Sequence, residues 1–279
     1  MFATTALVLS AGMAAAEVKF SANGRMGVTY DDSAAEKTQM NSRFRVAFSG
    51  SLTTDSGISA GGSIRADNAG NGASGTAGSV NISGAFGKIT MGDISSALDD
   101  AAGNLAGVGY TGLGDHSDFS WSGGGDDEGV SWSYTAGDLG VHASLGQRVA
   151  GADEGSVAVT YAMAPFSIGL GVSQDGGVSQ SGIGIGAEFA GANIKVGYLS
   201  ADNAAASAVK SEVGASISGT VGVLKVAAYF RSSETGAGVS SEYVGLGFSQ
   251  SLGGGATLAG GVVDANGVSK ADLGLNFSF

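Results

Sequence analysis

Apolar and polar residues alternate along most of this chain, and the alternation is clearest in residues 269–279. The apolar positions there are Ala271, Leu273, Leu275, Phe277 and Phe279, and the polar positions are Lys270, Asp272, Gly274, Asn276 and Ser278. Successive side chains of a β-strand point to opposite faces of its sheet. The segment therefore predicts a strand with one apolar and one polar face.

The same alternation recurs in about sixteen segments separated by turn residues. Residues 18–30 form the first segment, and the pattern continues with few breaks from Val130 to the end. Very short connections, such as Gly137-Asp138 and Ala164-Pro165, take turns with longer ones. Transmembrane β-barrels have this asymmetry because their periplasmic turns are short and their external loops are longer. We therefore predict an all-β fold, a 16-stranded antiparallel transmembrane β-barrel.

Two other all-β folds also have alternating strands. A soluble β-sandwich usually needs only seven to nine strands, and a β-helix would show a fixed repeat that this sequence lacks. A closed barrel leaves no exposed strand edges, however many strands it has. Sixteen strands also leave an aqueous lumen, whereas eight would be filled by side chains.

The alternation lapses between residues 93 and 128. The stretch is too long for an ordinary connection, so it is either functional or disordered. Its aromatic and large apolar residues favour an ordered loop; they include Tyr110, Leu113, Phe119 and Trp121. Its acidic residues include Asp93, Asp99, Asp100, Asp115 and Asp118.

Composition narrows the class of protein further. The 279 residues include 51 Gly and no Cys, so helices are disfavoured and thiol chemistry is absent. A hydrophobic content of 43% argues against disorder. The formal net charge of −12 disfavours nucleic acid as a partner, because phosphate binding needs clustered Lys and Arg.

Residues 1–16 are apolar and end in three alanines, as a signal peptide does before its cleavage site. The basic segment that normally opens such a peptide is absent or truncated at Met1. A retained helical anchor is the alternative, but a membrane span needs about 20 residues. Residues 17–279 would then form the barrel. We expect Glu17 to lie close to Phe279, with their terminal charges paired.

Several segments resemble the trimeric sixteen-stranded general-diffusion porins of photosynthetic and related alphaproteobacteria. They are GRMGVTYD (24–31), SRFRVAFSGSLTTDSG (42–57), SGAFGKITMGD (83–93), VGYTGLGD (108–115), GLGFSQSLGGGATLAGGV (245–262) and ADLGLNFSF (271–279). The resemblance spans almost the whole mature chain and is strongest at both ends.

The resemblance implies a homotrimer in the Gram-negative outer membrane, in contact with lipid and lipopolysaccharide. It also implies that residues 93–128 form a constriction loop folded into the lumen and the segment that leads the chain back to the barrel wall. Passive diffusion of small hydrophilic solutes and ions follows as the expected function. Calcium near the constriction loop is a further family feature, and the candidate ligands here are Asp93, Asp99 and Asp100.

Four arginines take the polar, lumen-facing parity of three consecutive strands: Arg25, Arg43, Arg45 and Arg65. Neighbouring strands lie about 4.8 Å apart, so these side chains can form one basic wall. Carboxylates of the loop from Asp93 to Asp118 would face it. Opposed charges across a narrow wet opening create a transverse field that favours dipolar solutes over apolar ones. The alternative is that these residues are merely solvated lumen charges.

Other functions find less support in the sequence. The spacing of Asp99 and Asp100 does not match an EF-hand loop, and adjacent carboxylates are often only solvated surface. Two His and no Cys make a zinc site improbable. We find no nucleophile, base and acid at a recognised spacing, so we do not predict an enzyme. A solute-selective channel is the main alternative, followed by a barrel enzyme of the outer membrane and by an adhesin. The net charge and the acidic loop predict a weak preference for cations.

Overall fold

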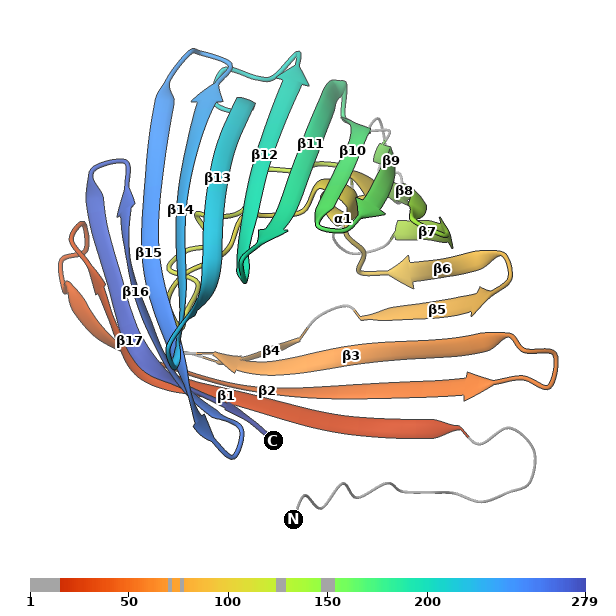
Figure 1. Cartoon of the computed structure of the whole chain (residues 1–279), viewed down its shortest axis with the longest axis horizontal. Coiled ribbons are helices and arrows are strands. Elements are labelled where there is room, and N and C mark those ends of the chain that lie inside the picture. The colour runs from red at the N-terminus through yellow and green to blue at the C-terminus, as the bar shows by residue number, and fades with distance from the viewer. Residues whose placement is uncertain (1–15, 70–71, 76–77, 124–128, 147–153) are drawn as a thin grey trace.

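The computed structural model is an antiparallel sheet that closes on itself (Figure 1). It describes residues 16–69, 72–75, 78–123, 129–146 and 154–279. The ring closes where β1 (Glu17–Asp31) pairs with β17 (Val268–Ser278), its last strand in sequence. Of the predicted signal peptide, residues 1–15 lie outside the described residues.

The strands between these two follow one another around the ring. Their bounds are β2 Thr38–Thr53, β3 Ser59–Ala69, β4 Gly72–Gly75, β5 Ser79–Gly84, β6 Gly87–Gly92, β7 Gly129–Ala136, β8 Leu139–Gly146, β9 Glu154–Met163, β10 Phe166–Asp175, β11 Val178–Phe189, β12 Ala192–Asp202, β13 Val209–Val221, β14 Leu224–Thr235, β15 Ser240–Gly253 and β16 Ala256–Ala265. In the described part of the connection between β6 and β7 lies the helix α1 (Ala97–Ala102).

Strands β4 and β5 share one position in the ring. Both pair with β3, β4 beside residues 66–69 and β5 beside residues 59–63. The seventeen strand elements of the described residues therefore fill sixteen positions. The predicted 16-stranded antiparallel barrel is confirmed.

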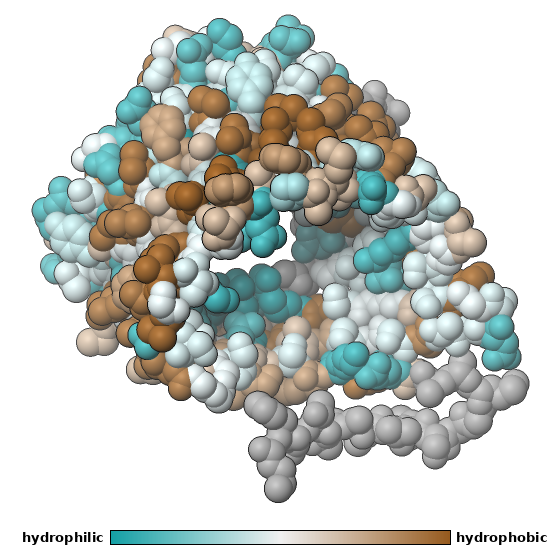
Figure 2. Space-filling model, viewed as in Figure 1, coloured by the Kyte–Doolittle hydropathy of each residue, from teal (hydrophilic) through white to brown (hydrophobic). Residues whose placement is uncertain are grey.

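The two faces of the wall differ as the alternation predicts. On β17, Leu273 points outward and is 48% exposed, whereas its neighbours Asp272 and Gly274 are buried inside. Apolar residues gather on the outer surface of the barrel, and hydrophilic residues border the opening at its centre (Figure 2). An apolar outer face suits lipid, and a polar inner face suits a water-filled lumen.

The short turns and both ends of the sheet lie at the same end of the barrel. Gly137 has φ +62° in the two-residue turn between β7 and β8, a conformation that glycine adopts without steric cost. The N–H of Phe279 donates to the carbonyl of Ala22 at 2.9 Å. The expectation that Phe279 approaches Glu17 is therefore wrong, because barrel strands are staggered along their register. Glu17 instead pairs with Lys19 at 3.3 Å.

No helix within the described ranges is long and apolar enough to cross a membrane.

Candidate channel constriction

Residues 93–123, the described part of the predicted constriction loop, run along the inner wall of the barrel. Helix α1 begins after Ser96, whose side chain accepts a hydrogen bond from the N–H of Asp99 at 3.0 Å. It ends at Gly103 after six residues. This helix was not predicted from the sequence, although Ser96 three residues before Asp99 is a usual start signal.

Two strands hold the start of α1. The N–H of Ala97 lies 3.0 Å from Oγ of Ser144 on β8 and 2.7 Å from Oγ of Ser156 on β9. Glycines on the next two strands leave room for the end of the helix. A Cβ at Gly169 or Gly184 would collide with the backbone of the last helical turn. The wall thus fits the helix through small residues on its inner face.

The middle of the loop is fastened to β17. Asp272, which is 7% exposed, accepts hydrogen bonds from the N–H of Tyr110 at 3.2 Å, the N–H of Thr111 at 2.8 Å and the Thr111 hydroxyl at 2.6 Å. Arg25 on β1 donates to the carbonyl of Thr111 at 3.3 Å. One carboxylate therefore satisfies three donors of residues 110–111.

The later part of the loop, residues 116–120, is held by β13 and β14. Glu212, which is 1% exposed, accepts from the N–H of Ser120 at 2.7 Å and from its hydroxyl at 3.1 Å. Glu212 also forms a buried ion pair with Arg231. Arg231 Nε in turn donates to the carbonyl of His116 at 2.8 Å. Glu212 thus holds the loop at Ser120 and Arg231 holds it at His116, while the two residues neutralise each other's charge.

Apolar residues of the loop form a small core with the wall. Leu105, Val108, Leu113 and Phe119 are buried in one cluster with Leu199, Tyr229 and Val263 of the strands. The Phe119 ring stacks on Trp121 at 5.0 Å. This packing agrees with the expectation of an ordered loop for residues 93–123, and residues 124–128 of the predicted loop lie outside the described residues.

The four predicted arginines lie together on β1, β2 and β3. Arg25 and Arg43 are direct partners across β1 and β2. Asp67 on β3 pairs with Arg45 Nε at 2.7 Å and with Arg65 Nε at 2.8 Å. The basic wall therefore carries a carboxylate of its own, Asp67, which was not predicted from the sequence.

The five predicted loop aspartates are spread along the loop. Asp93 opens the loop, where its N–H donates to the carbonyl of Gly78 at 2.8 Å. Asp99 interacts electrostatically with Lys195 and Asp118, and Asp100 with His142 and Lys88. Asp115 interacts with Arg25 and with Asp118. Among these five aspartates, Asp115 is the one with an electrostatic interaction with an arginine of the wall, Arg25.

Partial burial raises the pKa of three of these carboxyls. Desolvation is the largest cause at Asp99, Asp100 and Asp118. Neighbouring carboxylates add to the rise in pKa at Asp99 and Asp118, and Lys195 opposes it at Asp99. These groups gain protons at a higher pH than ordinary carboxyls do.

The predicted calcium ligands do not form one ligand set. Among the described residues, no group of three or more His, Cys, Asp or Glu side chains is placed to hold a metal ion. Asp99 and Asp100 are consecutive in α1, so their side chains project about 100° apart around the helix axis. They also face different basic residues. The arrangement of Asp93, Asp99 and Asp100 therefore does not fit a shared calcium ion.

Among the described residues, three buried acids were not predicted as site residues: Asp67, Glu212 and Asp272. Each takes the lumen-facing parity of its strand, and that parity was the available signal. Parity cannot separate a buried acid from a solvated one. It tells which face of the sheet a side chain takes, but not which group the side chain contacts there. Their role in the structure is to bind arginines and the loop.

Comparison with known proteins agrees with this architecture. The family model described as Gram-negative porin matches residues 3–268. The chain belongs to the Gram-negative porin family. A porin of Rhodobacter capsulatus is 33% identical over 304 residues, which cover 94% of this chain and 100% of that relative.

Solved porin structures share the fold. A porin structure refined at 1.8 Å is 32% identical, with a TM-score of 0.82 over 94% of this chain and 100% of the other. A mutant of Rh. blastica porin reaches a TM-score of 0.80 at 19% identity over the same shares, and that likeness concerns the fold alone. The predicted resemblance to porins is confirmed, and with it the function of an outer-membrane porin channel.

Proposed function

We propose that this porin is a general-diffusion channel whose narrowest part lies between the arginine wall and the inserted loop. The observation that carries the proposal is the fastening of residues 96–122 to inward-facing side chains of the barrel. Hydrogen bonds reach the loop from Arg25, Ser144, Gln180, Glu212 and Asp272, on five separate strands. A loop held in this way narrows the lumen without closing it.

The charges favour hydrophilic solutes at the narrow part. Arg25, Arg43, Arg45 and Arg65 supply the basic side, and Asp115 and Asp118 supply acidic groups on the loop. A transverse field orders water, so an apolar solute must displace that water to pass. Small hydrophilic solutes and ions pass without this cost.

The channel weakly prefers cations in this proposal. The net charge is −12, and residues 1–16 carry no ionisable side chain, so a mature chain keeps all of it. The arginine wall opposes the preference and keeps it small. Passive diffusion of this kind requires no cofactor and no enzymatic chemistry.

The native form in this proposal is a homotrimer in the outer membrane of a Gram-negative cell, in contact with lipid and lipopolysaccharide. Residues 1–16 direct export as a signal peptide. Apolar outward residues on the early strands, such as Phe44, Phe48 and Ile64, are half-exposed in one copy and supply surface for neighbours as well as lipid.

Liposome swelling with uncharged sugars of graded size tests the general-diffusion function. We expect swelling rates to fall smoothly as the sugar grows, because entry depends on size. A rate that depends on sugar stereochemistry at constant size would instead indicate a solute-selective channel. Liposomes without protein give the background rate.

A further inference from the structure

A cavity lies between the loop and the short turns. The cavity has a volume of about 310 Å³ and is bounded by loop residues 107–109 and by strands β12 to β15. Gly191, at the turn between β11 and β12, also lines it. Ligand pockets in proteins start at about 300 Å³, so this cavity has room for one small solute.

Polar side chains line this cavity in two rows. Thr220, Lys225 and Ser249 are successive direct partners across β13, β14 and β15. Asn193 and Ser218 are direct partners across β12 and β13. Side chains of direct partners lie about 4.5–5.5 Å apart at Cβ, so each row can contact one solute.

Lys225 gives the cavity a positive charge. None of the residues that line it is acidic. Within the described part of the chain, no ion pair involves Lys225. Lys195 on the same inner wall interacts with Asp99 of the loop, and Arg231 is paired with Glu212. Lys225 therefore differs from its basic neighbours in having its ammonium group available to a solute.

We propose that this cavity, the turn-side subsite, binds small hydroxylated anions such as sugar acids after they pass the loop. The Lys225 ammonium binds the carboxylate, and the hydroxyl and amide groups of Thr220, Ser249, Asn193 and Ser218 bind the solute hydroxyls. The inference rests on the proposed diffusion function. Lys225 is exposed to lumen water, so binding is weak and exchange with the lumen is fast.

Single-channel recording in a planar bilayer tests the subsite. The probes are gluconate, glucose and acetate, added to channels in potassium chloride. We expect gluconate to produce brief partial blocks of the open current, and glucose and acetate to produce far fewer at equal concentration. Gluconate alone combines the charge with the row of hydroxyls. Equal blocking by glucose, or by acetate, would overturn the proposal.

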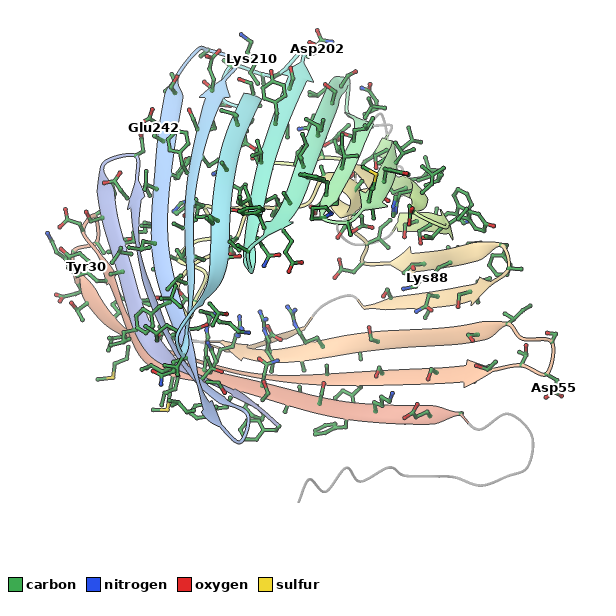
Figure 3. All side chains as sticks on the ribbon, viewed as in Figure 1. Tyr30, Asp55, Lys88, Asp202, Lys210 and Glu242 are labelled. Atoms are coloured by element: carbon green, nitrogen blue, oxygen red, sulfur yellow. The ribbon has the colours of Figure 1, made fainter. Side chains whose placement is uncertain are left out.

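Substitutions locate the binding. Lys225→Met should raise the half-blocking gluconate concentration about tenfold, which corresponds to about 1.4 kcal/mol, and Lys225→Arg should restore most of the block. Lys210→Met is the matched control, because Lys210 lies at the other end of the barrel beside Glu234 (Figure 3). An unchanged block in Lys225→Met would refute the site.

A second variant covers the case in which Lys225→Met does not form channels. Thr220→Val combined with Ser249→Ala keeps the charge and removes two hydroxyls, so gluconate should lose most of its advantage over acetate. A retained advantage would refute the assignment of these hydroxyls. The open current in potassium chloride without a probe reports separately on the diffusion channel, so failure of the subsite and failure of the channel are distinguishable.

Discussion

Asp272 is the residue whose removal should most directly free the middle of the loop. Its carboxylate accepts hydrogen bonds from Tyr110 N–H, Thr111 N–H and the Thr111 hydroxyl, and it is buried on the inner face of β17. Asp272→Ala removes all three acceptor contacts at once. The two backbone N–H groups then lack a protein partner unless water enters.

The size of the effect follows from these contacts. A hydrogen bond to a charged group contributes about 1.5–3 kcal/mol, and neighbouring contacts are not additive. Entering water also replaces part of the loss. We therefore expect loop attachment near Thr111 to weaken by about 3–5 kcal/mol. Even 3 kcal/mol raises the detached population more than a hundredfold.

Single-channel conductance measures the outcome. We expect Asp272→Ala to increase both the mean conductance and the current noise, because residues 109–113 then sample positions away from the wall. Asp272→Asn keeps one oxygen acceptor, so its conductance and noise should fall between those of the wild type and those of Asp272→Ala. Asp55→Ala is the control, since it removes the same charge from the turn between β2 and β3, outside the lumen (Figure 3).

Two results would contradict this reasoning. Wild-type conductance and noise in Asp272→Ala would mean that the other anchors alone fix the loop. An equal change in Asp55→Ala would mean that charge, and not loop attachment, causes the effect. The β-sheet content measured by circular dichroism should be unchanged, because the sheet itself loses no backbone pairing.

Three further predictions concern the narrow part and the assembly. Replacing Arg43 and Arg45 with Ala should raise conductance and cation preference, and unchanged reversal potentials in a salt gradient would place the constriction elsewhere. Burial raises the pKa of Asp99, Asp100 and Asp118, so these groups lose their negative charge at a higher pH than ordinary carboxyls do. Lowering the pH should therefore weaken cation preference while the pH is still above the usual carboxyl pKa. Reversal potentials that stay constant down to pH 4 would oppose this. Scattering mass in detergent should correspond to three chains, and a stable monomer would contradict the trimer.

The barrel could be predicted because lipid and water act on alternate residues of every strand. Leu273 and Asp272 differ in exposure as their parity requires, and the same rule holds across most of the sheet. Helix α1 was not predictable from periodicity, since six residues give less than two turns of pattern. The shared position of β4 and β5 depends on pairing with β3, which alternation within a segment does not encode.

The candidate site was harder to predict because its partners lie far apart in sequence. Parity places Arg45, Arg65 and Asp67 on the inner face, but only the register of β2 and β3 makes Arg45 the direct partner of Asp67, whose other partner Arg65 lies on the same strand. Glu212 meets Ser120 across 92 residues. Such contacts form in the folded barrel, and no local pattern in the sequence indicates them.

The structure also limits how far the net charge of −12 acts on passing ions. Glu212 is neutralised by Arg231 and Asp67 by two arginines, and the buried Asp272 carboxylate accepts hydrogen bonds from the loop. A charge that is paired and buried contributes little field to the lumen water. Ions therefore respond chiefly to the partly exposed loop carboxylates and to the arginine wall, which have opposite signs. The channel should discriminate between ions less than its composition alone would suggest, and the field across the narrow part should matter more than the net charge.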